Sequence, residues 1–395
     1  MNRARCVTLF SPAWPPTAAP NGIVTYTGYM KRALESGGVR TIVAVPDDGE
    51  DSADVFHAMK RPGLLRRAGA KLGLGGNGDA AGARLAGAVR GLVGRERVDV
   101  VEMEESFGWC GDVARDCGAP VVGRLHGPWF LNGPNVGAAQ DEGFRLRVDR
   151  EREGILRCAG VTSPSRDVLE RTRAYYGVEL SGAEVIPYPI EPFPEAARWR
   201  PDGHEPGLIL FIGRFDRHKG GDVILDAFGL VASRSSAARL LFVGPDRGLA
   251  DGKGGRAMMA DYLQRLPASA RERVEWTGFQ PADRLPALRA RAAVTVVCSR
   301  YETFGYTVLE GMAGGCPMVV TRAGGPSELV EHERSALMCE PGDPQGLALQ
   351  IERMLGDANL ARRLGEEGFR DACTRYEPAA IAERTLGFYG KVLRT

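Results

Sequence analysis

The sequence of 395 residues contains no C-x-x-C pair, no long apolar run and almost no net charge. Its eight cysteines are scattered, which excludes a zinc ribbon and a dense disulfide scaffold and fits a reducing compartment. No run approaches the roughly 20 apolar residues that cross a bilayer. The 51 basic and 50 acidic side chains argue against binding to nucleic acid through net charge. The first residues lack the pattern of a secretory signal, so we expect a cytoplasmic protein.

Short apolar runs rich in valine and isoleucine alternate with stretches of helical periodicity. This alternation predicts parallel sheets with helices on both faces. The expected strands are residues 5–10, 41–45, 98–101, 121–125, 161–163, 208–212, 240–243, 274–277, 293–298 and 318–321. Because ten strands fit two sheets better than one, the sequence predicts an α/β fold with two doubly wound, Rossmann-like domains.

Prolines are concentrated between residues 187 and 206. Proline removes a backbone donor and disfavours helix in the preceding residue, so this stretch predicts a linker. We place the N-terminal domain at residues 1–195 and the C-terminal domain at 196–376. Ligands of doubly wound sheets bind at the carboxyl ends of strands, against helix N-termini. The loops that follow strands are therefore the candidate sites.

Two loops of the first domain carry candidate binding residues. Asn21 can cap a helix that begins at Gly22, where a glycine lets a phosphate approach the backbone N–H groups. Gly22 fits a crowded turn equally well. His126 lies at the end of the strand expected at 121–125. It could contact a sugar hydroxyl or stabilise developing charge, or it could be satisfied by a loop carbonyl.

Arg214 and Lys219 lie in a glycine-rich loop between the strand at 208–212 and a helix that begins near Asp222. An arginine fork and a lysine point charge suit a diphosphate group. The loop lacks the G-x-x-x-x-G-K-[ST] spacing of a P-loop. A solvated basic loop is the alternative, but the position directly after a strand favours binding.

The segment 299–310 follows another buried strand. Thr303 can cap the helix that follows, with Glu302 just before it and Glu310 about two turns inside. The first backbone N–H groups of that helix are expected to form an anion site. These groups belong to Phe304, Gly305, Tyr306 and Thr307. The outer carboxylate can bind sugar hydroxyls, and the deeper one can accept hydrogen bonds from a ribose.

Glu302 and Glu310, followed by the sequence GMAGGCP at 311–317, resemble the signature of retaining glycosyltransferases of family 4 (glycosyl transferases group 1), which have the GT-B architecture. The resemblance covers almost the whole chain. It includes Asn21-Gly22, His126-Gly127, Ser163-Pro164-Ser165, Gly213-Arg214, Lys219-Gly220, Gly244-Pro245, Gly278-Phe279 and Gly324-Gly325-Pro326-Ser327-Glu328. It implies that a C-terminal helix at about 377–395 completes the first domain.

The resemblance also implies roles for these residues. Arg214 and Lys219 match the pair that holds the donor diphosphate. Glu302 matches the carboxylate that contacts the transferred sugar, and Glu310 matches the one that binds the nucleotide ribose. His126 matches a histidine beside the donor sugar. No metal ion or other cofactor is expected, because these cations and the helix amides can stabilise the leaving group and the sequence has no D-x-D motif.

The acceptor side is defined less sharply by the sequence. The resemblance places Gly22 near the diphosphate and the acceptor. Trp14 and Trp129 lie in loops after strands, and we expect them on the acceptor side. Glu102 and Glu105 follow the strand expected to end at residue 101, so they could line the acceptor site or be solvated loop charges.

The expected activity is the transfer of a sugar from a nucleoside diphosphate to a hydroxyl group, with UDP favoured as the nucleotide and GDP next. The acceptor can be a glycan, a lipid-linked molecule or a small molecule. A lipid-linked acceptor would give a purpose to the basic segment 60–71, which could lie on an anionic membrane or be a solvated helix face. A nucleotide-sugar epimerase and a non-catalytic nucleotide-sugar-binding protein are the alternatives.

Overall fold

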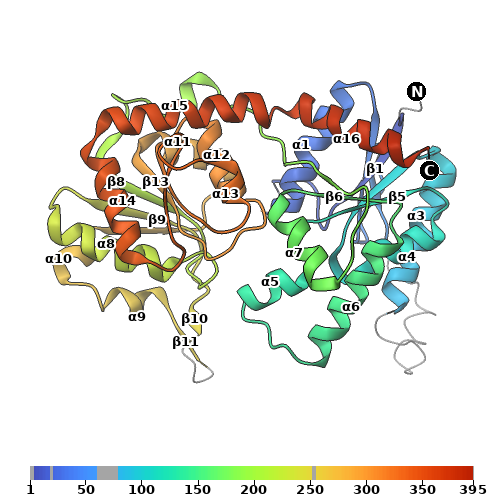
Figure 1. The fold of residues 1–395 in the computed structure, drawn as a ribbon, viewed down its shortest axis with the longest axis horizontal. Helices are drawn as coiled ribbons and strands as arrows, with labels where there is room; N and C mark the ends of the chain where they lie inside the picture. The colour runs from blue at the N-terminus through green and yellow to red at the C-terminus, as the bar shows by residue number, and fades with distance from the viewer. Residues whose placement is uncertain (1–3, 18–20, 60–78, 251–254, 395) are drawn as a thin grey trace. The chain divides into compact units, whose positions relative to one another are not determined.

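A computed structural model gives the arrangement of most of the chain (Figure 1). The described residues are 4–17, 21–59, 79–250 and 255–394. The basic segment 60–71 lies outside them. Among the described residues, no helix is both long and apolar enough to cross a membrane. The chain forms two compact units: residues 1–134, 139–189 and 378–395 make up the first, and residues 135–138 and 190–377 make up the second.

The first unit is built on a seven-stranded parallel sheet with the order β3-β2-β1-β4-β5-β6-β7. Its strands are β1 (Cys6–Phe10), β2 (Arg40–Val45), β3 (Val55–His57), β4 (Val100–Glu104), β5 (Val121–Arg124), β6 (Gly160–Ser163) and β7 (Glu184–Val185). Its helices are α1 (Gly22–Ser36), α3 (Asp79–Glu96), α4 (Trp109–Asp116), α5 (Trp129–Asn135), α6 (Glu142–Arg157), α7 (Arg166–Tyr176) and α16 (Pro378–Val392), with a 3-10 turn at Ser106–Gly108.

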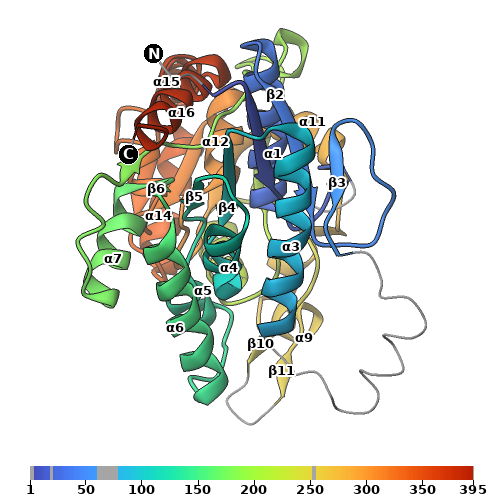
Figure 2. The same ribbon diagram turned by 90° about the vertical axis from the view of Figure 1, so that its right-hand side faces the viewer.

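Alternate residues of the strands point to opposite faces of this sheet, and each face is covered by helices. On one face, Cys6 and Phe10 of β1 pack in the same apolar core as α3 and α4. Helix α4 packs against both α3 and α6 (Figure 2). On the other face, Tyr389 of α16 donates a hydrogen bond to Glu102 of β4 at 2.8 Å. The C-terminal helix is therefore an integral part of the first unit.

The second unit has a six-stranded parallel sheet with the order β12-β9-β8-β13-β14-β15. Its strands are β8 (Glu205–Ile212), β9 (Arg239–Val243), β12 (Val274–Gly278), β13 (Ala292–Val297), β14 (Met318–Thr321) and β15 (Leu337–Cys339), beside an antiparallel pair, β10 (Leu249–Ala250) and β11 (Arg256–Ala257). Its helices are α8 (Gly221–Arg234), α9 (Met259–Leu263), α10 (Ala268–Arg271), α11 (Leu285–Arg291), α12 (Tyr306–Ala313), α13 (Pro326–Leu329), α14 (Pro344–Gly356) and α15 (Ala358–Arg375), with 3-10 turns at Glu195–Ala197 and Ala282–Arg284.

The core of the second unit also has two layers. Ile209 and Phe211 of β8 belong to a large apolar cluster with α8 and α14. Leu208 and Leu210 point to the opposite face, where Leu285 of α11 packs. This alternation follows from the period of two in a strand, and it explains why β8 is apolar without interruption over these residues.

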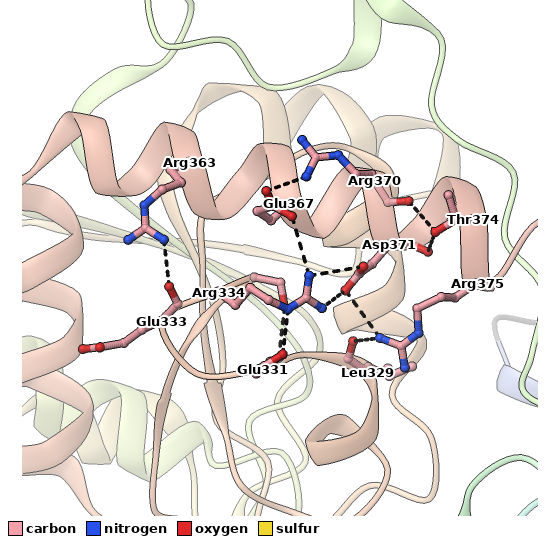
Figure 3. Close-up of polar contacts among 11 residues, drawn as sticks. Leu329, Glu331, Glu333, Arg334, Arg363, Glu367, Arg370, Asp371, Thr374 and Arg375 are labelled. Atoms are coloured by element: carbon pink, nitrogen blue, oxygen red, sulfur yellow. Dashed lines mark hydrogen bonds and ion pairs between the residues drawn. The ribbon is translucent and has the colours of Figure 1, made fainter.

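A network of ion pairs fastens the segment after α13 to helix α15 (Figure 3). Arg334 pairs with Glu331 at 2.7 Å and with Asp371 of α15. Arg375 reaches the same carboxylate of Asp371 at 3.4 Å and donates to the backbone oxygen of Leu329. These contacts hold the end of α13, the helix that begins beside the glycines 324 and 325.

The predicted fold class, two doubly wound parallel α/β domains, is confirmed. All ten predicted strands are present, with small shifts at their ends. The expected start of a strand at Leu208 was wrong, because β8 begins at Glu205 and includes Pro206. Proline is tolerated near the beginning of a strand, where its missing N–H breaks few sheet hydrogen bonds.

Candidate active site

The order of strands reverses once in each sheet, between β1 and β4 in the first unit and between β8 and β13 in the second. The loops that follow such a pair of strands diverge, and ligands of doubly wound sheets bind there. In the second unit, the loop after β8 contains Arg214 and Lys219, and the loop after β13 contains Glu302. Parallel pairing of β8 with β13 places the beginnings of these two loops side by side.

Asp216 organises the loop after β8. One oxygen of its carboxylate accepts a hydrogen bond from Nε of Arg214 at 2.6 Å, and the other accepts from the backbone N–H of Lys219 at 2.7 Å. Because Arg214 uses only Nε for this bond, its two terminal nitrogens are left out of the pairing. The carboxylate therefore fixes the guanidinium of Arg214 and the backbone at Lys219, whereas the ammonium of Lys219 is bound by Glu302.

Gly220 allows this loop to reach the end of β13. Its φ of +73° lies in the left-handed region, and a Cβ atom at this position would be 2.2 Å from the backbone oxygen of Cys298. Only glycine satisfies both conditions without strain. Because Gly220 directly follows Lys219 and precedes α8, this close approach brings the lysine to the loop that carries Glu302.

Lys219 and Glu302 form an ion pair between the two loops. The same oxygen of Glu302 accepts a hydrogen bond from the hydroxyl of Ser299 at 2.7 Å. Burial alone raises the pKa of Glu302, but the Lys219 ammonium, the His218 ring and the two hydrogen bonds outweigh it and hold the pKa below its usual value. Glu302 is therefore ionised at neutral pH.

Two glycines, Gly324 and Gly325, lie against the backbone of Glu302. Its N–H donates to the carbonyl of Ala323 at 3.3 Å, and its carbonyl accepts from the N–H of Gly325 at 2.9 Å. Gly324 has a φ of +69°, and a Cβ atom there would be 2.4 Å from the carbonyl oxygen of Glu302. A side chain at Gly324 would therefore push the segment that carries Glu302 out of place.

Helix α12 begins two residues later than an N-cap at Thr303 would place it. The expected N-cap at Thr303 was wrong: Gly305 is the N-cap, with a φ of +99° and no side-chain hydrogen bond to the first turn. Phe304 and Gly305 are buried, whereas Tyr306 and Thr307 are partly exposed. A helix start without a side-chain cap keeps the geometry that binds anions, and the anion-binding role of these four residues stays a prediction.

Glu310 lies inside α12 and pairs with Arg289 of α11, at 2.6 Å between Oε2 and Nη2. Arg289 is almost completely buried, and Glu310 is partly exposed. The sequence offered no reason to connect these two residues, which are 21 positions apart on different helices.

In the first unit, His126 lies just beyond the end of β5, as expected. Its Nδ1 contacts the hydroxyl of Tyr188. Glu105 accepts hydrogen bonds from the backbone N–H groups of His126, at 2.9 Å, and Gly127, at 2.7 Å. Burial and the nearby Arg124 guanidinium lower the pKa of His126 well below its usual value, so the ring is neutral at pH 7.

The expected position of Glu102 after a strand was wrong. Strand β4 continues to Glu104, and Glu102 is buried within it. One of its oxygens accepts from the hydroxyl of Tyr26 at 2.7 Å, and the other accepts from the hydroxyl of Tyr389 at 2.8 Å. Glu105 does follow β4, but it is also buried, and burial raises its pKa to about 8. Both carboxylates are thus occupied by internal contacts.

The remaining candidates of the first unit lie at element starts and in loops. Gly22 is the exposed first residue of α1, whose N-cap Asn21 accepts from the N–H of Ile23 at 2.8 Å. Trp14 is partly exposed in the loop after β1. Trp129 begins α5, and the guanidinium of Arg147 lies 3.8 Å from the centre of one of its rings.

The structure thus joins some of the predicted residues directly. Lys219 contacts Glu302, and Asp216 links Lys219 to Arg214. Sequence reasoning assigned no role to Asp216, Ser299, Arg289 or Tyr188. Of these, only Asp216 left a signal, as an acidic residue between two cationic ones in a glycine-rich loop. Within the described ranges, no group of three or more His, Cys, Asp and Glu side chains is arranged to hold a metal ion.

Two family profiles match the chain in succession. The profile described as Glycosyltransferase Family 4 matches residues 20–192, and the profile described as Glycosyl transferases group 1 matches residues 196–371. The two matches follow each other and together cover most of both units.

Curated relatives match parts of the chain. An uncharacterised glycosyltransferase of Methanocaldococcus jannaschii is 30% identical over 184 residues, which are 46% of this chain and 44% of the relative. Mannosylfructose-phosphate synthase of Agrobacterium fabrum is 27% identical over 252 residues, which are 62% of this chain and 55% of that enzyme. The chain therefore spans about half the length of these relatives.

Solved structures resemble the whole chain. Sucrose-phosphate synthase of Thermosynechococcus elongatus has a TM-score of 0.73 at 20% identity, with 99% of both chains covered. The Anabaena protein HepE, solved in complex with UDP, has a TM-score of 0.69 at 19% identity, with 98% of this chain and 100% of HepE covered. At these identities the likeness establishes the fold alone.

Proposed function

Because this chain belongs to the family 4 glycosyltransferases of GT-B architecture, we propose that it moves a sugar from a nucleoside diphosphate to an acceptor hydroxyl, with retention of the anomeric configuration and without a metal ion. The donor is a UDP-sugar in first preference and a GDP-sugar in second. The acceptor is a glycan, a lipid-linked molecule or a small molecule. The observation that carries the proposal is the loop after β8, where Asp216 orients the guanidinium of Arg214 and Glu302 binds the ammonium of Lys219.

Stabilisation of the departing diphosphate is the main task of such a site. The ammonium of Lys219 has three N–H donors, and Glu302 accepts from one of them. Arg214 keeps its terminal N–H groups for phosphate oxygens, because Asp216 accepts only from Nε. The amides at the start of α12 add further donors. A preorganised donor of this kind contributes about a hundredfold to the rate.

Retention through a covalent intermediate would require a carboxylate nucleophile. The oxygen Oε1 of Glu302 already accepts from both Lys219 and Ser299, which supports a positioning and electrostatic role for this residue. We therefore propose that the acceptor attacks from the face that the diphosphate leaves, and that a diphosphate oxygen takes the acceptor proton. His126, which is neutral, contributes a hydrogen bond to the sugar rather than a charge.

The first experiment measures thermal stability with UDP, GDP, ADP and TDP in the absence of metal ions. A ligand that binds only the folded state at a hundred times its Kd stabilises it by about 2.7 kcal/mol. HepE was solved with UDP, which supports UDP as the first nucleotide to test. The stabilisation should disappear in Lys219→Ala and persist in the matched variant Lys391→Ala, whose lysine pairs with Glu184 in the first unit.

Turnover then separates the transferase from its alternatives. Lys219→Ala and Glu302→Ala should each reduce transfer by about a hundredfold while far-UV circular dichroism stays unchanged. Near-normal turnover in either variant would count against the assignment. Conversion of the donor sugar to its epimer without acceptor would identify an epimerase, and nucleotide binding without any turnover would identify a binding protein.

A further inference from the structure

Arg289 is a buried charge whose only ionic partner among the described residues is a predicted ligand of the nucleotide. Its side chain is 1% exposed, and Nη2 lies 2.6 Å from Oε2 of Glu310. Its Nε and Nη1 atoms are buried and have no hydrogen-bond partner. Glu310, by contrast, keeps 28% of its side chain exposed. The guanidinium is thus inside the domain, and the carboxylate extends from it towards the surface.

The rest of helix α11 does not require an arginine at this position. Leu285 and Leu288 of this helix pack against the apolar residues of β8 and β9, and Arg289 is as deeply buried as the residues of that core. A buried guanidinium with two unsatisfied nitrogens costs free energy that an apolar residue would avoid. The contact that offsets this cost is the charge-assisted hydrogen bond to Glu310.

We infer that Arg289 is a positioning residue for recognition of the donor's ribose. By holding Oε2, it fixes the rotamer of Glu310, and it leaves Oε1 to accept hydrogen bonds from the ribose hydroxyls. In the part of the chain that the structure describes, Oε1 of Glu310 makes no hydrogen bond. This inference rests on the proposed function, because it takes the ligand of the second unit to be a nucleoside diphosphate.

The consequence is discrimination between ribose and deoxyribose. A carboxylate held in place and partly desolvated loses a charge-assisted hydrogen bond when the ligand lacks the hydroxyl, and it cannot turn to find another partner. A carboxylate free to rotate into solvent loses much less. Arg289 therefore determines how strongly the site distinguishes the two sugars, in addition to how tightly it binds the nucleotide.

The test is isothermal titration of UDP, 2′-deoxy-UDP and 3′-deoxy-UDP with the chain of 395 residues. The wild type should bind UDP about tenfold or more tightly than at least one deoxy form, the ratio expected for a hydrogen bond to a charged group. Arg289→Met and Glu310→Gln should each reduce that ratio to about twofold or less, and the double variant should lower it no further. If Arg289→Met does not fold, Arg289→Gln replaces it.

Arg291→Met is the matched control, since Arg291 lies on the same helix but is exposed and pairs with Glu205. It should keep the wild-type ratio. A ratio that stays at the wild-type value in the Arg289 variants, or that is absent in the wild type, overturns the inference. A wild type that binds none of the three nucleotides, nor GDP, overturns the proposed function instead, so the two failures are distinct. A purely structural role for Arg289 would lower thermal stability and leave the ratio unchanged.

Discussion

Replacement of Asp216 by asparagine tests whether orientation of the cations matters to the chemistry. The carboxylate accepts two hydrogen bonds, at 2.6 Å from Arg214 and at 2.7 Å from the N–H of Lys219. Asparagine has the same shape but only one acceptor oxygen, so its amide N–H₂ must face one of the two donors. One charge-assisted hydrogen bond is lost, and either the Arg214 guanidinium or the backbone at Lys219 is no longer held in place.

The expected loss of activity depends on how far solvent weakens the hydrogen bond between Asp216 and Arg214. A hydrogen bond to a charged group contributes about 1.5–3 kcal/mol. Here the side chains of Asp216 and Arg214 are 16% and 38% exposed, so solvent reduces the contribution to about 1–2 kcal/mol. If the lost contact stabilises the transition state by this free energy, kcat/KM should fall about 5- to 30-fold. The loss should appear mainly in kcat, because the cations are proposed to stabilise charge that develops as the diphosphate leaves.

Steady-state kinetics with the preferred donor, with thermal unfolding in parallel, measures both quantities. Asp246→Asn is a matched control in the same unit, because Asp246 also accepts two hydrogen bonds, from the N–H groups of Gly248 at 2.9 Å and Met259 at 2.8 Å. Neither of these donors is a predicted site residue. Full activity in Asp216→Asn, or an equal loss in both variants, would refute the role given to Asp216.

Three further predictions concern stability and are measured by urea denaturation. Gly220→Ala should destabilise the chain by more than about 1 kcal/mol, because the φ of Gly220 is +73° and a Cβ atom there would clash with a backbone carbonyl. Gly387→Ala in α16 is the contrasting variant: its Cβ atom would meet open space, and the change should stabilise the chain by about 0.5–1 kcal/mol. Burial and a nearby guanidinium lower the pKa of His126 in the folded state, so protonation favours the unfolded state. As the pH falls below 6.5, the free energy of unfolding of the wild type should decrease by up to about 1.4 kcal/mol per pH unit more than that of His126→Gln. Tyr389→Phe should cost about 1–3 kcal/mol, because it leaves one oxygen of buried Glu102 without its donor.

The sequence predicted the large parallel strands well, because strands buried on both faces are continuous apolar runs. It missed β3, β7, β10, β11 and β15, which have two or three residues each and are too short to show a period. Helix α1 was predicted at its first residue, since Asn21 makes a local capping bond two positions away. Signals of this kind depend on neighbours in the chain, and local sequence is sufficient to reveal them.

The two wrong predictions at the candidate site residues, Glu102 and Thr303, arise from contacts between residues far apart in the chain. Glu102 was expected beyond its strand because acidic residues normally end a buried run, but its partners Tyr26 and Tyr389 are 76 and 287 positions away. Thr303 was expected to cap α12, but the backbone there packs against Gly325, where a Cβ atom would be 2.5 Å from Cα of Phe304. In both cases a tertiary contact outweighs a local preference that sequence alone can evaluate.

The same dependence on distant contacts explains why the net charge of the chain gives no indication of the proposed anionic ligand. The central residues of the second unit are two cations, Arg214 and Lys219, and two anions, Asp216 and Glu302, so their charges cancel. Under the proposed function, attraction of a diphosphate to this cluster would therefore come from the direction of N–H groups rather than from net charge. That direction is set by Asp216 within the loop and by Glu302 from a loop 83 residues away. A sequence gives the sum of its charges, but only the fold decides which carboxylate turns which cation towards a ligand.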